Sequence, residues 1–254
     1  MIRIAAVGDI HMGPDSQGVL RPAFETLPDC ADVLLLAGDL TRHGTPEEAR
    51  VVAREIADLG VPVVAVLGNH DHHDERPEEV TAILKDGGAR VLESEETVLE
   101  CPAGRIGVAG TKGFGGGFAG RNAGEFGEPL MKEFVRYSRR CADGLRAALE
   151  RLGGQDCAAR IALTHFSPVP DTLAGEPLEI YPFLGSYLLA EAIDEAGADL
   201  AVHGHAHAGT EHGMTSGGVR VRNVAQPVIG RAFHVYHLPG LERVPAAAGA
   251  EQAR

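Results

Sequence analysis

The chain has 254 residues, of which 44% are hydrophobic and 23% charged, as in ordinary soluble globular proteins. Its formal net charge of −13 disfavours long nucleic acid as a partner, because attraction to a polyanion requires a basic face. The longest apolar run, near residues 33–37, is far shorter than the roughly 20 residues of a membrane-spanning helix. The chain begins with a strand-like run and not a signal peptide, so a cytoplasmic protein is expected.

Short apolar runs alternate with helical patterns, which is typical of a βαβ series. The apolar runs predict strands at residues 2–7, 33–37, 61–67, 89–92, 96–100, 105–110, 159–164, 199–202, 218–224 and 232–238. The helical patterns predict helices at residues 46–59, 78–86, 128–152 and 184–196. The first three strands are rich in Val, Ile, Leu and Ala, as buried parallel strands are. The last two are expected to close the fold as an antiparallel pair.

No internal repeat, long linker or change of composition divides the chain, so residues 1–240 are expected to form a single domain. Residues 241–254 are rich in Ala and predict a flexible C-terminal tail. The strands near residues 218–238 also offer an edge at which a homodimer could form.

Residues 113–120 form a glycine-rich loop that contains Gly115-x-Gly117-x-x-Gly120, formally a dinucleotide fingerprint. No predicted helix follows at once, and Arg140 stands where that fingerprint needs an acidic residue. The favoured interpretation is a flexible loop near the active site, because glycines permit close backbone approach and hinge motion.

Metal-ligand side chains follow five of the predicted strands. The five groups are Gly8-Asp9-Ile10-His11, Gly38-Asp39, Gly68-Asn69-His70-Asp71, His165 and His203-Gly204-His205-Ala206-His207. Each group alone has an ordinary explanation, since Asp often caps a turn and a single His is usually a hydrogen-bonded core residue. The carboxyl ends of parallel strands, however, meet at one edge, where α/β proteins bind ligands. Five such groups at one edge predict a metal site.

The donor types indicate which metals this site would take. Carboxylate, amide oxygen and imidazole ligands suit borderline divalent ions such as Mn, Fe, Zn or Co. None of the four cysteines falls within the five groups, whereas structural zinc sites usually include cysteine. Two divalent ions would outweigh the charges of Asp9 and Asp39, and the site would attract an anionic substrate into an acidic protein.

The ordered set of motifs resembles the signature of the calcineurin-like metallophosphoesterase superfamily. The resemblance rests on G-D-x-H at 8–11, G-D at 38–39, G-N-H-D at 68–71, His165 and G-H-x-H at 204–207, and it covers the chain up to about residue 207. It implies an α/β fold in which a two-sheet β-sandwich is flanked by helices and holds two metals at one end. The spacing and the size are most similar to the bacterial phosphodiesterase branch that includes cyclic-nucleotide enzymes.

The resemblance also implies a role for each position. Asp9, His11 and His207 would hold one metal, Asn69, His165 and His205 would hold the other, and Asp39 would bridge both. His70 would be a catalytic imidazole that binds no metal, with Asp71 as its orienting partner. His203 lies outside the ligand sets.

The reaction expected from this site is hydrolysis of phosphate esters by direct attack of a metal-bridging hydroxide, without a phosphoenzyme. His70 would stabilise the developing charge or protonate the leaving oxygen. Small nucleotide-like phosphodiesters are the favoured substrates, although a phosphomonoesterase or a nucleotide pyrophosphatase would use the same site. A catalytically silent protein-binding scaffold is the alternative of another class, but such proteins lack a ligand or the catalytic histidine, and here every position is filled.

Polar residues near the motifs are candidates for substrate binding. Arg121 and Asn122 follow the glycine-rich loop, and His72 and His73 follow the catalytic motif. Solvated loop residues are the alternative interpretation of all four. Four aromatic residues could either stack a base or pack their own loops: Phe114, Phe118, Phe166 and Tyr181.

Overall fold

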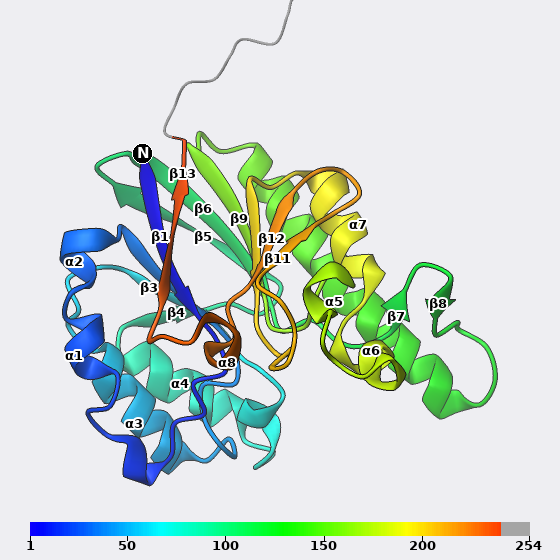
Figure 1. The fold of residues 1–254 in the computed structure, drawn as a ribbon, viewed down its shortest axis with the longest axis horizontal. Helices are drawn as coiled ribbons and strands as arrows, with labels where there is room; N and C mark the ends of the chain where they lie inside the picture. Colours follow the sequence, from blue (N-terminus) through cyan, green and yellow to red (C-terminus); the bar gives the residue numbers. More distant parts are fainter. Residues whose placement is uncertain (240–254) are drawn as a thin grey trace, which may run out of the picture.

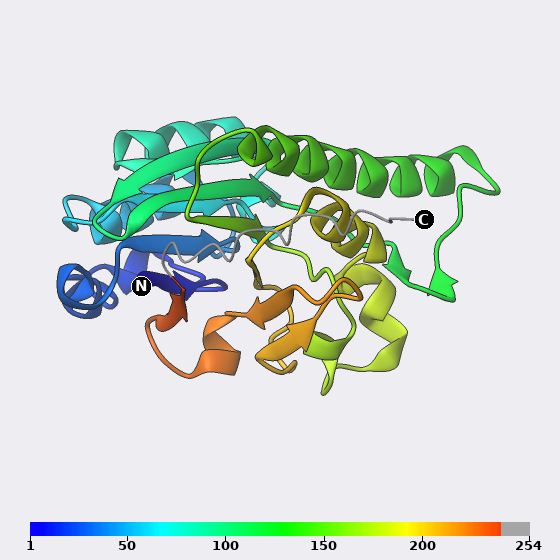
Figure 2. The ribbon, with the colours of Figure 1, turned by 90° about the horizontal axis from the view of Figure 1, so that it is seen from above.

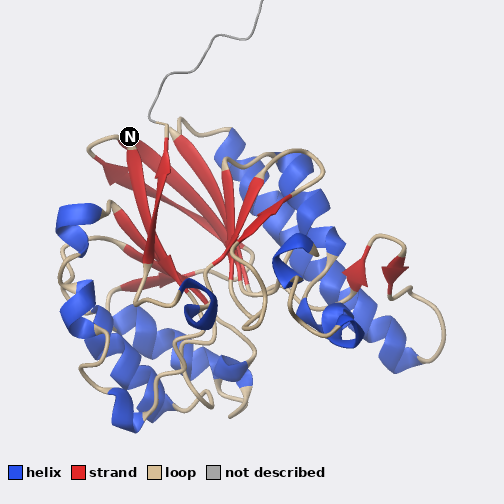
Figure 3. Ribbon diagram, viewed as in Figure 1, coloured by secondary structure: helices blue, strands red, loops and turns tan. Residues whose placement is uncertain are grey.

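The computed structural model describes residues 1–239, so the predicted tail at 241–254 lies outside the described residues. Two β-sheets pack face to face, and helices cover the outer face of each sheet (Figures 1 and 3). The predicted two-sheet sandwich flanked by helices is confirmed.

The first sheet has the strand order β13-β1-β2-β3-β4. Its strands are β1 (Ile2–Val7), β2 (Val33–Ala37), β3 (Val63–Val66), β4 (Ala89–Val91) and β13 (His234–Leu238). β1 to β4 run parallel, and β13 pairs antiparallel with β1 at the edge. Its outer face carries α1 (Arg21–Phe24), α2 (Leu27–Cys30), α3 (Pro46–Ile56) and α4 (Pro77–Asp86).

The second sheet has the order β11-β12-β10-β9-β6-β5. Its strands are β5 (Glu95–Cys101), β6 (Gly104–Thr111), β9 (Ala159–Thr164), β10 (Leu200–His203), β11 (His212–Met214) and β12 (Arg220–Asn223). The four inner strands run parallel, with an antiparallel strand at each edge. The long α5 (Pro129–Gly153) and α7 (Tyr187–Ala196) cover its outer face, as Figure 2 shows from above.

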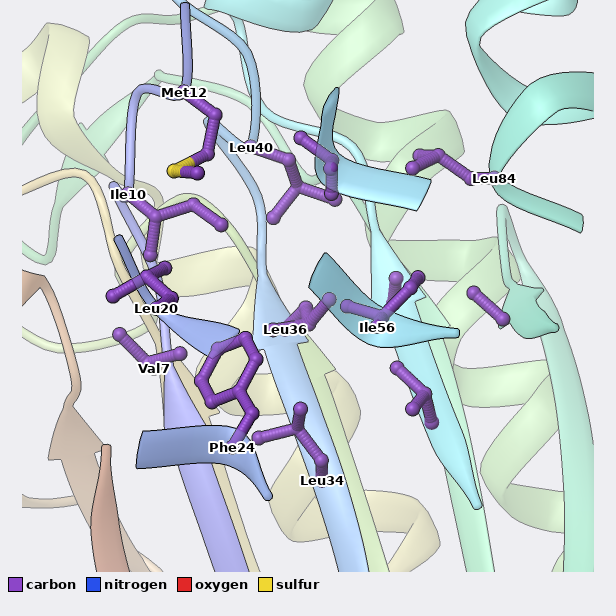
Figure 4. Close-up of a cluster of buried hydrophobic side chains, with 14 of the residues drawn as sticks. Val7, Ile10, Met12, Leu20, Phe24, Leu34, Leu36, Leu40, Ile56 and Leu84 are labelled. Atoms are coloured by element: carbon purple, nitrogen blue, oxygen red, sulfur yellow. The ribbon is translucent and has the colours of Figure 1, made fainter. Parts of the chain in front are cut away.

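Side chains alternate between the two faces of each strand, so each sheet has an apolar layer on both faces. One layer packs against the other sheet, and the other packs against the helices. In β1, Ile4 and Ala6 face the second sheet, whereas Ala5 and Val7 face the helices. Figure 4 shows the helix side, where Phe24 of α1 packs beside side chains of β1 and β2. Burying each large apolar side chain contributes roughly 1.5–3 kcal/mol, so these layers fix the ends of the strands in place.

The remaining elements are short and lie at the carboxyl end of the strands or beyond it. They are β7 (Gly117–Phe118), β8 (Arg121–Asn122), α6 (Tyr181–Leu184), α8 (Gln226–Ile229) and the 3-10 turns η1 (Pro14–Ser16), η2 (His70–His72), η3 (Asp171–Leu173) and η4 (Leu178–Ile180). No helix within residues 1–239 is both long enough and apolar enough to cross a bilayer.

The glycine-rich loop leads into the β7–β8 hairpin, which confirms that no helix follows it directly, as a dinucleotide fingerprint would need. The backbone amides of Gly116 and Gly117 donate hydrogen bonds of 2.7 Å and 2.9 Å to the carbonyls of Pro182 and Gly185. The loop is therefore attached to the segment around α6.

The prediction that residues 218–224 and 232–238 pair with each other is wrong. β12 pairs with β10 and β11 in the second sheet, whereas β13 pairs with β1 in the first. The chain crosses between the sheets after β12, where the Gly8 amide donates to the Val224 carbonyl and the Gln226 amide donates to the Gly8 carbonyl, both at 2.9 Å. α8 then carries the chain on to β13.

Candidate metal centre

Asp and His side chains from both sheets meet at the carboxyl end of the strands. They form two groups in which the ligand atoms all lie within 4.8 Å of one another: Asp9, His11, Asp39 and His207, and Asp39, His165 and His205. Asp39 belongs to both groups. Asn69 lies beside the second, with its amide oxygen 2.9 Å from Nε2 of His165. The clusters are consistent with a binuclear metal site and coincide with the two ligand sets that the resemblance implied.

The local packing fits two small cations with oxygen and nitrogen ligands. Nε2 of His11 is buried, has no hydrogen-bond partner, and lies 3.8 Å from Oδ2 of Asp39. Glycines bring the loops together: a Cβ at Gly68 would collide with Asp39, and one at Gly204 would collide with Asp9. An unpaired imidazole nitrogen close to carboxylate oxygens is consistent with a site for a borderline divalent ion.

Backbone strain is concentrated at this site. Among the seven described non-glycine residues with positive φ, four are candidate ligands, namely Asp9 (57°), His11 (41°), Asp39 (50°) and His205 (71°). Each such conformation costs of order 1–3 kcal/mol and persists only where the surrounding structure imposes it. The fold thus accepts a conformational free-energy cost at these four residues, whose side chains lie together in the ligand groups.

Asp39 and His165 stabilise each other's charged forms. Burial raises the pKa of Asp39, but the charge of His165 and hydrogen bonds from His165 and the His70 amide bring it well below its usual range. Burial lowers the pKa of His165, yet the carboxylates of Asp39 and Asp9 raise it to about 9. A metal that binds here therefore has to displace a proton held by His165.

Two further candidate ligand histidines, His205 and His207, differ in their protonation. Burial lowers the pKa of His205 to about 3, so this imidazole is a neutral ligand at ordinary pH. The hydrogen bond between Nε2 of His207 and Oδ1 of Asp9, at 2.9 Å, raises the pKa of His207.

His70 stands at the edge of the centre with a fixed ring orientation. Its Nδ1 donates a 2.9 Å hydrogen bond to the carbonyl of Arg42, and its Nε2 lies 3.9 Å from Oδ2 of Asp39. The ring packs edge-on against His11, with centroids 4.5 Å apart. The free nitrogen of the imidazole is thereby directed toward the ligand clusters.

The prediction that Asp71 orients the His70 imidazole is wrong. The buried Asp71 carboxylate accepts hydrogen bonds from the amides of Leu40, Thr41 and Gly68 at 3.2, 2.8 and 2.8 Å. It thus ties the loop after β2 to the loop after β3, and the Arg42 carbonyl orients the ring instead. No residue pattern could indicate this, because the orienting atom belongs to the backbone.

The neighbouring histidines have separate environments. His203 is buried outside the ligand groups, as predicted, and its Nε2 lies 2.8 Å from Oγ1 of Thr172. The ring of His73 stacks on that of His70 at 4.2 Å. Nε2 of His72 is buried without a hydrogen-bond partner. His73 therefore lies beside the centre, whereas no contact places the His72 ring there, and binding of substrate by either histidine stays a prediction.

Arg121 and Asn122 are not brought to the ligand clusters. Both are exposed in β8, which Figures 1 and 2 place at the outer end of the molecule, beyond α6. Their role in substrate binding stays a prediction that no contact in the structure supports.

The aromatic residues divide into two groups. Phe118 and Tyr181 pack with each other, with ring centroids 6.4 Å apart, and hold their loops together. Phe166 lies against the His205 ring at 4.2 Å and so forms part of the wall of the metal centre.

Sequence reasoning missed two neighbours of the centre. The carbonyl of Phe183 lies 3.2 Å from Nε2 of His205. Lys112 follows β6, which runs parallel to β9, so it reaches the same end of the sandwich as His165. Searching every strand end for charged residues, and not for metal ligands alone, would have found Lys112.

Comparison with known sequences gives results that agree with this geometry. The model of the family described as calcineurin-like phosphoesterase matches residues 2–209. A protein named as a probable cyclic nucleotide phosphodiesterase, from Synechococcus sp., is 34% identical over 92 residues, which are 32% of this chain and 34% of that protein. The symmetrical bis(5'-nucleosyl)-tetraphosphatase of Burkholderia mallei is 36% identical over 96 residues, which are 37% of this chain and 29% of that protein. The matches thus span about a third of these curated relatives.

Solved structures share the fold at low sequence identity. The phosphopantetheinyl hydrolase from Mycobacterium tuberculosis superposes with a TM-score of 0.65 at 18% identity, over 97% of this chain and 98% of that one. The Thermus thermophilus protein TT1561 superposes with a TM-score of 0.55 at 20% identity, over 87% of this chain and 88% of that one. With the family model covering most of the sequence and the ligand clusters in place, the chain belongs to the calcineurin-like phosphoesterase family.

Proposed function

We propose that the protein is a two-metal phosphoesterase that cleaves phosphodiester bonds in small, nucleotide-like substrates. The observation that carries the proposal is the pair of ligand groups that share Asp39, with the oriented His70 imidazole beside them. When bound, two divalent ions would lower the pKa of water and neutralise the phosphoryl oxygens. The donor set suits Mn, Fe, Zn or Co.

The residues of the chain divide the work between holding metals and acting on the ester. Asp9, His11 and His207 would hold one ion, Asn69, His165 and His205 the other, and Asp39 both. His70 would donate a proton or a hydrogen bond from Nε2 to the leaving oxygen, since its Nδ1 is already engaged by the Arg42 carbonyl. Asp71 would keep the two ligand loops in register through their amides.

The names of the sequence relatives support a nucleotide-like substrate. One is named for cyclic nucleotides and the other for a bis-nucleosyl tetraphosphate, so both names describe nucleotide compounds. The second name favours cleavage of a nucleotide phosphoanhydride as a second candidate function at the same site.

The test compares two chromogenic esters with the manganese-loaded protein. Bis(p-nitrophenyl) phosphate reports diester cleavage and p-nitrophenyl phosphate reports monoester cleavage, and the Asp39→Asn variant serves as the control. Faster cleavage of the diester, lost in Asp39→Asn, is the expected result, after which cyclic nucleotides and dinucleoside polyphosphates would be compared. A preference for the monoester would show that the protein is a phosphomonoesterase and not the proposed phosphodiesterase. Two bound metals without turnover of either ester would favour a binding scaffold.

A further inference from the structure

An open groove with mostly apolar walls lies along the N-terminal half of α5. Its volume is about 300 Å³, and it is lined by Phe114, Leu130, Glu133, Phe134 and Tyr137. Leu130, Phe134 and Tyr137 are spaced by four and three residues, so they lie on one face of the helix. Phe114 comes from the glycine-rich loop, and its ring lies 5.1 Å from that of Phe134 and 4.8 Å from that of Tyr137. We refer to this feature as the aromatic groove.

Two series of contacts connect the aromatic groove to the metal centre. In the interior, the Phe114 ring lies 5.6 Å from the Phe166 ring, which lies 4.2 Å from the ring of the candidate ligand His205. Nearer the surface, the Phe183 ring lies 6.5 Å from the Phe134 ring, and the Phe183 carbonyl lies 3.2 Å from Nε2 of His205. The groove is therefore separated from the ligand groups by single aromatic residues.

Phe183 is an exposed aromatic residue beside the metal centre. It is 60% exposed, and standard backbone geometry places its Cα within about 6 Å of Nε2 of His205. Exposed apolar side chains that gather in one patch mark a binding surface more often than scattered ones do. A nucleotide whose phosphate is held at the metal ions extends over a comparable distance from that phosphate to its base.

The charges near the aromatic groove are already paired or buried. Of the five described residues that line it, Glu133 alone is charged, and its carboxylate pairs with the guanidinium of Arg140 at 2.7 Å. Lys112, whose ammonium lies 5.3 Å from the centroids of Phe114 and Tyr137, is buried and does not line the groove. A phosphate is therefore a poor occupant, whereas a neutral planar ring finds aromatic faces to pack against. The size suits one ring system and not a protein partner, since a stable protein interface buries about 1,200–2,000 Å².

We propose that the aromatic groove, with Phe183 at the end nearer the metal centre, binds the nucleobase of the phosphodiester substrate. The reacting phosphate stays at the metal ions while the base stacks on Phe183 and Phe134. Every base has a π face, so this surface selects nucleotide esters over simple alkyl esters without selecting one particular base. This inference rests on the proposed function for the position of the phosphate.

The test measures how much a nucleobase adds to affinity. AMP and ribose 5-phosphate share the sugar and the phosphate monoester and differ in the base, and AMP is the kind of product that cleavage of a nucleotide diester releases. Both are titrated calorimetrically into the manganese-loaded protein. The wild type should bind AMP roughly tenfold more tightly than ribose 5-phosphate, as expected for one stacked base. Phe183→Ala should bring this ratio close to one, whereas Phe183→Tyr, which keeps an aromatic ring, should preserve it.

Two further variants test the position of the base. Phe134→Ala removes a ring of the aromatic groove itself and should also lower the ratio. Phe126→Ala is the matched control, because Phe126 is 87% exposed just before α5 and does not line the groove, so it should keep the ratio of the wild type. If Phe134→Ala does not fold, Phe183→Ala still decides, since it removes an exposed side chain.

Each result supports or overturns the assignment. Absence of AMP binding, a ratio near one in the wild type, or an unchanged ratio in either alanine variant of the groove overturns it. A dimer that is lost in Phe134→Ala while the ratio is unchanged would assign the groove to a second copy of the chain. Because the titration needs no turnover, absence of ester cleavage with the expected ratios would refute the proposed function alone. Cleavage of the diester with unchanged ratios in the variants would refute the base site alone.

Discussion

The backbone amide of His70 donates a 2.7 Å hydrogen bond to Oδ1 of Asp39, the carboxylate that both ligand groups share. The proposed catalytic imidazole is therefore attached, through its own backbone, to the proposed bridging ligand. Asp71 also holds these two loops together, because its carboxylate accepts hydrogen bonds from the amides of Thr41 and Gly68. A displacement of Asp39 would also displace His70, whereas loss of the His70 ring should leave Asp39 in place.

Substitution of His70 should separate catalysis from metal binding. His70→Gln is expected to lower kcat for the preferred ester by about 10²–10⁴, the usual contribution of a general acid or base. Because the hydrogen bond to Asp39 comes from the backbone, both metals should remain, as measured by elemental analysis of the dialysed protein. His237→Gln, in the exposed part of β13, is the control and should behave as wild type. Loss of metal in His70→Gln would assign this residue to the ligands.

A single methyl group at Gly68 should disrupt the centre. The Cβ of Gly68→Ala would overlap the carboxylate and the amide of Asp39, far inside van der Waals contact. We expect activity to fall at least about a hundredfold, as for a misplaced catalytic group, together with weaker metal binding. Gly124→Ala is the matched control, since nothing lies within 4 Å of its new Cβ. Equal activity of the two variants would show that the Gly68 loop can relax and that the close approach is dispensable.

Metal should stabilise the folded chain through ligands that come from both sheets. Ligand binding to the folded state alone adds RT ln(1 + [L]/Kd), or about 2.7 kcal/mol at a hundred times the Kd. Addition of manganese to the metal-free protein should therefore raise the midpoint of thermal unfolding, and a chelator should reverse the rise. In Asp39→Asn the rise should be much smaller, because Asp39 belongs to both groups. An equal rise in this variant would place the bound metal elsewhere.

The start of α3 should give the protein part of its acid sensitivity. Glu48 accepts hydrogen bonds from the His43 amide at 2.7 Å and contacts Nδ1 of His43 at 3.0 Å. Burial raises the pKa of Glu48, but these hydrogen bonds and that of the Thr45 amide lower it below its usual value near 4.5. A carboxyl group whose pKa is lower in the folded state stabilises the protein above the usual value, and the stabilisation is lost as the pH falls through the folded-state pKa.

Urea denaturation between pH 6 and pH 3 measures this contribution. The wild type should lose more free energy of unfolding over this range than Glu48→Gln, which is already less stable at pH 6. Glu47→Gln, which removes an exposed carboxylate in the same helical turn, is the control and should follow the wild type. Parallel curves for wild type and Glu48→Gln would mean that this carboxylate has the same pKa in both states.

The ligand clusters could be predicted because strand ends are visible in a sequence. His165 follows an apolar run directly, and Asp9 and Asp39 each follow one after a single glycine, and parallel strands bring such ends together. The pairing of β12 and β13 could not be predicted, because apolar alternation identifies a strand but not its neighbour. The group that orients the His70 ring could not be predicted for a different reason. Asp71, the next residue in the sequence, is an obvious candidate, whereas the true partner is the backbone carbonyl of Arg42. Every residue has such a carbonyl, so the side-chain pattern does not single it out.

The division of the ligands between two sheets has a consequence for the order in which the protein matures. Asp9, His11, Asp39 and Asn69 come from the first sheet, whereas His165, His205 and His207 come from the second, and each ligand group draws on both. A nascent chain that has emerged only through β6 carries more than half of these donors but neither complete group. The edge strand of the first sheet, β13, is the last described strand to be synthesised. Capture of metal by a complete ligand group would thus be a late event in biogenesis, because a chain interrupted before β10 lacks His205 and His207 and cannot assemble either group in full.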